Sequence, residues 1–281
     1  MARIAIIGGG NIGEALLSGL LGSGREAKDL VVAESYRSRA EQLSQKYGVR
    51  VTGVADAAEN ADYVIVAVKP TDVDSVVATL ADLAAGADRD SVEQVVVSVA
   101  AGVTTEYFEA KLPAGSPVVR VMPNTPMLVG AGISALSRGR FVTDEQLTEV
   151  SAIFGAVGGV LTVPESQMDA VTAVSGSGPA YFFLMAEALV DAGVGAGLPR
   201  AVATDLVSKT MAGSAAMLLD RIESSGAGGM DTSAAQLRAS VTSPGGTTAA
   251  GLRELERGGL RAAVDAAVAA AKMRSEQLRI T

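Results

Sequence analysis

The sequence predicts a two-domain α/β protein, in which a doubly wound, mostly parallel sheet is followed by an all-helical domain. One observation is that short apolar runs alternate with helical patterns as far as residue 163, as they do in successive βαβ units. Another is that strand-like runs then stop, and long alanine-rich helical patterns replace them. We therefore expect two domains, residues 1–163 and residues 164–281.

Seven short apolar runs are the predicted strands. The run Val64, Ile65 and Val66 contains no polar residue, which is typical of a strand that helices cover on both faces. The loops at the carboxyl ends of such strands should form the ligand-binding edge of the sheet. The predicted strands are residues 3–7, 30–33, 63–68, 94–99, 118–121, 132–136 and 160–163.

The predicted helical domain has too few large apolar side chains to form a well-packed core by itself. Its first helix is apolar nearly all round, which favours burial against a second copy of the chain; a loosely packed monomeric bundle is the alternative. Pro179 and Pro199 suit first helical turns, where a missing N–H is not needed. Residues 224–233 are rich in glycine and serine and are expected to form a mobile loop. The expected helices are residues 179–192, 199–222, 234–241, 248–257 and 260–278.

Composition excludes several kinds of chemistry. The 281 residues include no cysteine and no histidine, so disulfides, thiolate ligands and Ser-His-Asp triads are excluded, and no metal site is expected. A formal net charge of −8 argues against a nucleic-acid-binding surface. Glu187 interrupts the apolar run 180–189, so we expect no membrane span and interpret the protein as cytoplasmic.

The most informative motif is a glycine-rich turn between the first strand and the first helix. Gly8 permits a tight turn, Gly10 lets the backbone approach a pyrophosphate, and Gly13 lets the helix pack closely on the strand. Asn11 and Ile12 begin that helix, whose free N–H groups and partial positive charge suit phosphates. This placement predicts a dinucleotide-binding Rossmann domain rather than an ordinary glycine-rich turn. The helix is expected over residues 11–21.

The end of the second predicted strand carries a carboxylate, Glu34, at the distance where a Rossmann domain binds the ribose. A carboxylate there would accept from the 2′-hydroxyl and repel a 2′-phosphate. Arg37 and Arg39 follow within one turn, and a guanidinium can bind a phosphate with two hydrogen bonds. Both arginines could equally be solvated charges at the start of a helix. Local chemistry therefore leaves the choice between NAD and NADP open.

Three further loops follow predicted strands at the same edge. A lysine at a strand end is more often simply solvated, and an asparagine there is more often a turn residue. Their shared location favours ligand binding, in which the asparagine amide could hold a nicotinamide or a substrate group. The candidate cofactor-binding residues in these loops are Val68, Lys69, Pro70, Ala100, Ala101 and Asn124.

Two polar turns stand out in the helical half, residues 175–179 and residues 243–248, each directly before a helix. In the second turn Pro244 restricts the backbone and the two following glycines can adopt positive φ. The N–H groups at its end, with two threonine hydroxyls, could converge on an anion. Helix capping and substrate binding are equally compatible with this pattern.

Several motifs occur together and in order along the chain, at spacings that are similar to those of a known family. In this combination, above all in its two turns before helices, the chain resembles the pyrroline-5-carboxylate reductase family over essentially its whole length. The motifs are residues 6–13, 67–70, 100–102, 124–126, 169–172, 175–181 and 243–248.

This resemblance implies an NAD(P)H-dependent oxidoreductase that reduces the C=N bond of 1-pyrroline-5-carboxylate to give L-proline, the last step of proline biosynthesis. It implies NADP(H) as the cofactor, with NAD(H) possible, and a homodimer that commonly assembles into a decamer. The substrate carboxylate would lie on backbone N–H groups of the turn 243–248, and the Thr248 hydroxyl, the catalytic group, would approach the imine nitrogen. Glu34 departs from NADPH-preferring members, which often have a small polar residue there. The implied substrate-binding residues are Ser243, Gly245, Gly246, Thr247 and Thr248.

Two rival functions follow from the same residues. A hydroxy-acid dehydrogenase of similar build needs a base to take the alcohol proton, usually lysine or histidine. The chain has no histidine and no lysine between residues 165 and 208, which disfavours it. The other rival is a non-catalytic NAD(P)-binding scaffold or sensor, which the intact turn 243–248 disfavours.

Overall fold

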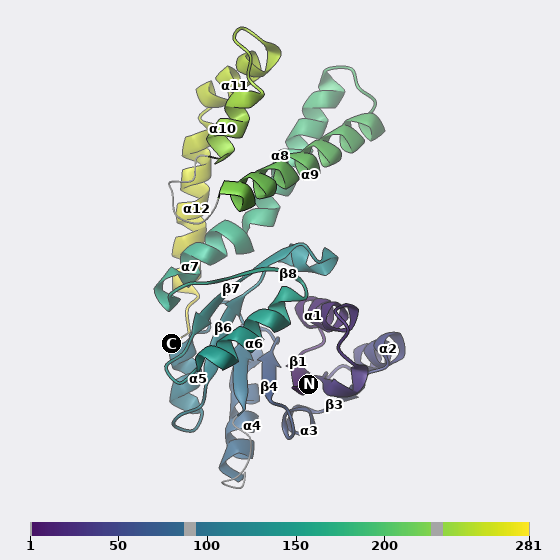
Figure 1. Cartoon of the computed structure of the whole chain (residues 1–281), viewed down its shortest axis with the longest axis vertical. Coiled ribbons are helices and arrows are strands. Elements are labelled where there is room, and N and C mark those ends of the chain that lie inside the picture. The colour runs from purple at the N-terminus through teal and green to yellow at the C-terminus, as the bar shows by residue number, and fades with distance from the viewer. Residues whose placement is uncertain (1, 87–93, 226–232, 281) are drawn as a thin grey trace. The chain divides into compact units, whose positions relative to one another are not determined.

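The computed structural model describes residues 2–86, 94–225 and 233–280, and the chain divides into two compact units (Figure 1). The first unit comprises Met1–Pro179 and Val268–Thr281, and the second comprises Ala180–Ala267. The predicted mobile loop 224–233 lies mostly outside the described residues.

A mixed sheet forms the centre of the first unit. In the described residues it has eight strands in the order β3-β2-β1-β4-β5-β6-β7-β8, and every neighbouring pair is parallel except β6 and β7. In register, Ile6 of β1 lies between Val32 of β2 and Ile65 of β4. The predicted doubly wound, mostly parallel sheet is confirmed. The strands are β1 (Ile4–Ile7), β2 (Leu30–Ala33), β3 (Arg50–Thr52), β4 (Tyr63–Val66), β5 (Val95–Ser98), β6 (Val118–Met122), β7 (Gly132–Arg138) and β8 (Gly158–Thr162).

Helices cover both faces of this sheet. The helices of the first unit are α1 (Asn11–Gly22), α2 (Arg37–Tyr47), α3 (Val54–Ala58), α4 (Val73–Gly86), α5 (Thr105–Lys111), α6 (Asp144–Gly155) and α7 (Met168–Val171). Short 3₁₀ turns occupy Ala27–Asp29, Pro70–Asp72, Thr125–Val129 and Glu165–Gln167, and a π-helical turn follows α7 at Thr172–Gly176.

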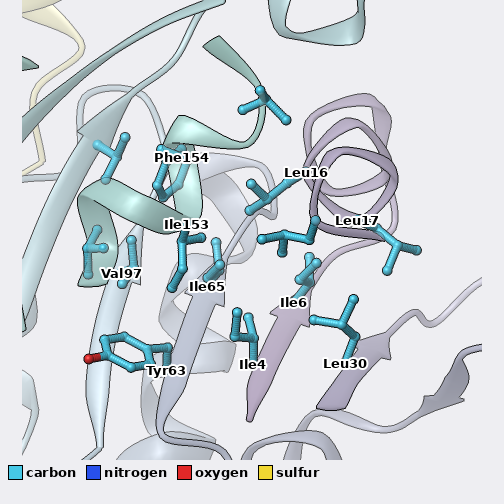
Figure 2. Close-up of a cluster of buried hydrophobic side chains, with 14 of the residues drawn as sticks. Ile4, Ile6, Leu16, Leu17, Leu30, Tyr63, Ile65, Val97, Ile153 and Phe154 are labelled. Carbon is cyan, nitrogen blue, oxygen red and sulfur yellow. The ribbon is translucent and has the colours of Figure 1, made fainter. Parts of the chain in front are cut away.

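Alternate residues of the buried strands point into two separate cores. Ile4 and Ile6 of β1 face α1 and α6, where Leu16 and Phe154 pack against them (Figure 2). Ala5 and Ile7 of the same strand face the other core, which includes Phe108 of α5 and side chains of α3 and α4. This period of two explains why the strand sequences are apolar throughout.

In the described residues, the secondary structure of the second unit consists of helices alone. Its elements are α8 (Gly178–Gly195), α9 (Arg200–Ser225), α10 (Ser233–Ser240), α11 (Thr247–Arg257) and α12 (Leu260–Gln277), of which α8 begins, and α12 ends, in the first unit. Large apolar side chains are exposed on α8: Phe182, Phe183 and Leu184 are 66%, 68% and 67% exposed in the single chain. One helical stretch, Glu165–Gly195, is long and apolar enough to cross a membrane, judged by length and composition only.

Candidate active site

The turn after β1 has the backbone geometry of a phosphate-binding loop. Gly8 has a φ of +112°, and a Cβ there would lie 2.6 Å from the carbonyl oxygen of Ala67. A Cβ on Gly13 would lie 2.0 Å from the Gly8 carbonyl oxygen, so only glycine lets α1 begin so close to the turn.

Gly10 is the glycine that leaves room for a ligand. A Cβ there would meet no protein atom within 4 Å, so the space beside the Gly10 backbone is not filled by the protein and is open to a ligand. Gly10 is also the N-cap of α1, and no side chain caps it. The first backbone bond of the helix joins the Glu14 N–H to the Gly10 carbonyl at 2.8 Å. The residues present therefore fit a pyrophosphate placed against the start of α1.

Loops from neighbouring strands end at the same edge of the sheet. β1 lies between β2 and β4, so the strand order changes direction at β1, and this is where a doubly wound sheet binds its ligand. The loops after β1, β2, β4, β5 and β6 all leave from this edge, because these strands are mutually parallel. All the predicted cofactor-binding residues belong to these five loops or to the helices that follow them.

Glu34, at the end of β2, is held by backbone donors. Its Oε2 accepts from the Gly9 N–H at 3.0 Å and its Oε1 accepts from the Tyr36 N–H at 2.9 Å. The carboxylate thus joins the glycine turn to the start of α2. Its remaining lone pairs can still accept from a ribose hydroxyl, and its charge still opposes a 2′-phosphate.

The two nearby arginines differ in what they contact. Arg39 donates to the Gly9 carbonyl at 2.8 Å and pairs with Glu14, so its guanidinium is engaged within the protein. The Arg37 side chain is 92% exposed and pairs at 2.9 Å with Glu41, one helical turn away. An exposed pair of this kind is weak. Arg37 is therefore the arginine that can reach a ligand, and the sequence did not distinguish the two.

Tyr36 is a candidate that sequence reasoning missed. It is the N-cap of α2, lies two residues after Glu34 and directly before Arg37, and is 75% exposed. An exposed aromatic ring next to the expected ribose position can stack on a base. An aromatic residue two positions after the acidic residue was the signal available in the sequence.

The carboxylate of Glu14 belongs to a cluster behind the glycine turn. Hydrogen bonds from Lys46 and Arg39 lower the pKa of Glu14 to about 2, against a raising effect of burial, and a hydrogen bond from Tyr47 adds to the lowering. The donor distances from Lys46 and Tyr47 are 2.9 and 2.8 Å. This cluster fixes α2 to α1, and it leaves Glu14 ionised at neutral pH.

The other predicted cofactor residues occupy more varied surroundings. Lys69 and Pro70 are exposed after β4, whereas Ala100 is buried and Ala101 exposed after β5. The Asn124 amide makes two internal bonds: Nδ2 donates to the Ser175 carbonyl at 3.2 Å, and Oδ1 accepts from the Ile133 N–H at 2.9 Å. Among the residues that the structure describes, one N–H and one lone pair of this amide remain for a ligand.

The turn 243–248 belongs to the second unit and starts α11. Gly245 has a φ of +71°, a conformation that favours glycine, and a Cβ on Gly246 would lie 2.5 Å from the Ser243 Oγ, which would have to rotate away. Gly246 is the N-cap and no side chain caps it. Within the described residues, the hydroxyls of Thr247 and Thr248 make no hydrogen bond, and both residues are exposed. Neither hydroxyl caps α11, so both are available to a ligand.

Both halves of the chain match known protein families. Residues 165–278 match the family model for pyrroline-5-carboxylate reductase dimerisation, and residues 3–102 match that for NADP oxidoreductase, coenzyme F420-dependent. The strand order and the glycine turn agree with the second match, and the exposed apolar helices agree with the first. Together they define an NAD(P)-dependent oxidoreductase with a helical dimerisation domain.

Individual relatives identify the family more specifically than the two family models do. The chain is 70% identical over 289 residues to the pyrroline-5-carboxylate reductase of Mycobacterium tuberculosis (strain ATCC 25618 / H37Rv), covering 100% of this chain and 98% of the relative. The solved structure of a pyrroline-5-carboxylate reductase from Coxiella burnetii has a TM-score of 0.90 at 36% identity, covering 100% and 99% of the two chains. A Plasmodium falciparum pyrroline carboxylate reductase, solved with NADP bound, has a TM-score of 0.81 at 28% identity, covering 99% and 98%. This chain belongs to the pyrroline-5-carboxylate reductase family.

Proposed function

We propose that this chain reduces 1-pyrroline-5-carboxylate to L-proline with NAD(P)H, the last step of proline biosynthesis. The observation that carries the proposal is the turn 243–248: at the start of α11 it presents N–H groups that no side chain caps, and two threonine hydroxyls that have no hydrogen bond among the described residues. The 70% identity to a reductase of this name supports the same substrate.

The turn supplies the groups that the substrate requires. N–H groups at the start of α11 would hold the substrate carboxylate, with Gly245 and Gly246 allowing close approach. The Thr248 hydroxyl would hydrogen-bond at the ring nitrogen and orient the imine. The nicotinamide, when bound, supplies the hydride that forms the new C–H bond at the imine carbon. The C=N π electrons pass to nitrogen, which already carries its proton in the iminium form, so no histidine is needed. Orientation of the two reactants is then the main catalytic contribution.

The cofactor is NADP(H), and we propose that NADH is also accepted. The Gly8, Gly10 and Gly13 backbone would hold the pyrophosphate, and the loops at residues 68–70 and 100–101 with Asn124 would line the nicotinamide side. Glu34 would accept from a ribose hydroxyl and weaken the discrimination for NADPH, while the exposed Arg37 would partly offset its charge.

We further propose that the helical domain, residues 164–281, forms a homodimer and that dimers assemble into a decamer. The exposed apolar side chains of α8 support a protein partner, and the dimerisation model that matches residues 165–278 supports a second copy of this chain. On this proposal the apolar stretch Glu165–Gly195 is covered by protein rather than lipid, and the enzyme works in the cytoplasm.

The direct test is loss of reduced-nicotinamide absorbance when 1-pyrroline-5-carboxylate is added to the purified protein. We expect turnover with NADPH and with NADH, and none when substrate is omitted. L-Proline should accumulate in equal amount to the cofactor oxidised. Binding of NADPH without substrate-dependent oxidation would contradict the proposal and favour a non-catalytic scaffold.

A further inference from the structure

The loop after β5, residues 100–102, is paired with the carboxyl-terminal end of the chain. The Ile280 N–H donates to the Gly102 carbonyl at 2.7 Å, and the Ile280 carbonyl accepts from the Thr104 N–H at 3.1 Å. Val103 and Ile280 thereby form a parallel bridge. Gly102 has a φ of +79°, and a Cβ there would lie 2.7 Å from the Leu278 carbonyl oxygen. Loop and tail are therefore in direct backbone contact.

A buried carboxylate fixes the direction of this tail. Asp169 of α7 is 2% exposed; it accepts from the Ser275 Oγ at 2.7 Å and also pairs with Arg279. Ser275 lies in the last turn of α12, and Arg279 directly precedes Ile280. A buried carboxylate is stable only with donors of this kind, so Asp169 holds the helix end and the tail together.

The loop 100–102 is also bonded to the end of β5. The Ala100 N–H donates to the Oγ of Ser98 at 3.3 Å, and both residues are buried. On the outer side, within the described residues, the N–H groups of Ala101 and Gly102 make no hydrogen bond, and Ala101 is exposed. The loop is thus held between the sheet and the tail, with free donors at the edge that also carries the glycine turn.

We propose that Asp169, Ser275, Arg279 and Ile280 form a tail clamp, which positions the loop 100–102 to bind the nicotinamide cofactor. This inference rests on one part of the proposed function, the cofactor site at this edge of the sheet, and does not depend on the reduction of 1-pyrroline-5-carboxylate. The four are positioning residues and act through the loop. Loosening the clamp should weaken cofactor binding by the folded protein and leave the KM for 1-pyrroline-5-carboxylate at saturating cofactor nearly unchanged.

The most selective variant is Ile280→Pro, which removes the N–H that donates to Gly102 and keeps the carbonyl that Thr104 needs. Ile280→Val is its matched control, since it keeps the N–H and a branched apolar side chain. NADPH dissociation constants would be measured on the full-length protein by fluorescence of the reduced nicotinamide. We expect the proline variant to bind about three- to tenfold more weakly, the scale of losing one hydrogen bond, and the valine variant to match the parent.

A second pair of variants, at Ser275, tests the contact with Asp169. It also tests the proposal if Ile280→Pro does not fold. Ser275→Ala removes the hydroxyl that Asp169 accepts from, and Ser275→Thr restores one. Weaker NADPH binding by the alanine variant, with recovery in the threonine variant, is expected. Parent-like NADPH affinity in folded Ile280→Pro or Ser275→Ala protein would overturn the clamp. A parent protein that binds NADPH but does not oxidise it with 1-pyrroline-5-carboxylate would overturn the proposed function and leave the clamp standing.

Discussion

The Glu34 carboxylate accepts from the Gly9 N–H at 3.0 Å, so the acidic residue after β2 is bonded to the glycine turn after β1. A second bond from the Tyr36 N–H fixes the other carboxylate oxygen. The side chain therefore has a structural role in addition to the one proposed for it in cofactor selection. A substitution here must be designed so that the two roles can be separated.

Replacing Glu34 should change cofactor preference. Glu34→Gln keeps one acceptor oxygen for a backbone N–H and removes the charge, whereas Glu34→Ser removes the charge and both of the carboxylate oxygens that accept these bonds. Because a carboxylate repels a 2′-phosphate, we expect both variants to raise the ratio of kcat/KM for NADPH to that for NADH, by roughly three- to thirtyfold. The serine variant, which loses both backbone bonds, should lower the melting temperature more than the glutamine variant, which loses one of them. An unchanged or reduced ratio in both variants would place Glu34 away from the ribose.

The Glu14 cluster should make stability depend on acid pH. The pKa of Glu14 is about 2 in the folded protein and 4.5 when unperturbed, so its contribution is fully present above pH 4.5 and is lost as the pH falls from there through 2. At pH 7 we expect Glu14→Gln to cost about 2 to 3 kcal/mol in the free energy of unfolding. Urea denaturation at several pH values would show the difference from the parent shrinking below pH 4.5. Glu41→Gln, which alters an exposed pair on α2, is the matched control and should show little effect. A difference that stays constant with pH would contradict the cluster's role.

The local sequence pattern predicted most strands of the sheet. It missed β3, a strand that is defined by its pairing with a neighbouring strand. β3 was missed because its three residues, Arg50, Val51 and Thr52, form no apolar run. They pair with β2 at the sheet edge, where an exposed side chain is tolerated. The helices of the second unit begin and end close to the predicted residues, since proline, glycine and threonine mark their ends locally.

The partners of charged side chains were beyond sequence reasoning. Arg39 and Glu14 are 25 residues apart, and Asp169 and Arg279 are 110 apart, so only the folded chain brings them together. The sequence therefore could not distinguish Arg37 from Arg39. In the structure Arg37 is exposed, whereas Arg39 pairs with Glu14. The glycine turn and the turn 243–248 could be identified as candidates, because the role proposed for each depends on backbone N–H groups and its glycines are visible in the sequence.

An acidic substitution on α8 should break the assembly. Phe183 is 68% exposed in the single chain, and a two-fold interface would bury it twice. Burying one such side chain contributes about 1.5 to 3 kcal/mol, so Phe183→Asp should weaken dimerisation by roughly a hundredfold or more. Ala84→Asp adds the same charge at an exposed position of α4 and should leave assembly unchanged. Sedimentation would measure both. A parent protein that is fully active as a monomer would contradict the proposed dimer.

Of the side chains in the turn 243–248, that of Thr248 should affect the proposed reaction most. Its hydroxyl makes no hydrogen bond within the described chain, and it does not cap α11, so removing it should not unfold the turn. The N–H groups that would hold the substrate carboxylate remain in any side-chain variant. We therefore expect Thr248→Ala to lower kcat/KM for 1-pyrroline-5-carboxylate by roughly ten- to a hundredfold, the scale of one oriented hydrogen bond in a closed site. NADPH affinity should barely change, because the glycine turn belongs to the other unit.

Two matched variants show whether the hydroxyl at this position is what matters. Thr248→Ser keeps a hydroxyl and should retain more activity than the alanine variant. Thr247→Ala removes the neighbouring hydroxyl, leaves its N–H in place, and should lower kcat/KM by less than about threefold. The measurement is steady-state kinetics at saturating NADPH, with circular dichroism to verify folding. Folded Thr248→Ala enzyme as active as the parent would mean that the hydroxyl does not act at the imine nitrogen, and that orientation by the backbone of the turn is sufficient for hydride transfer.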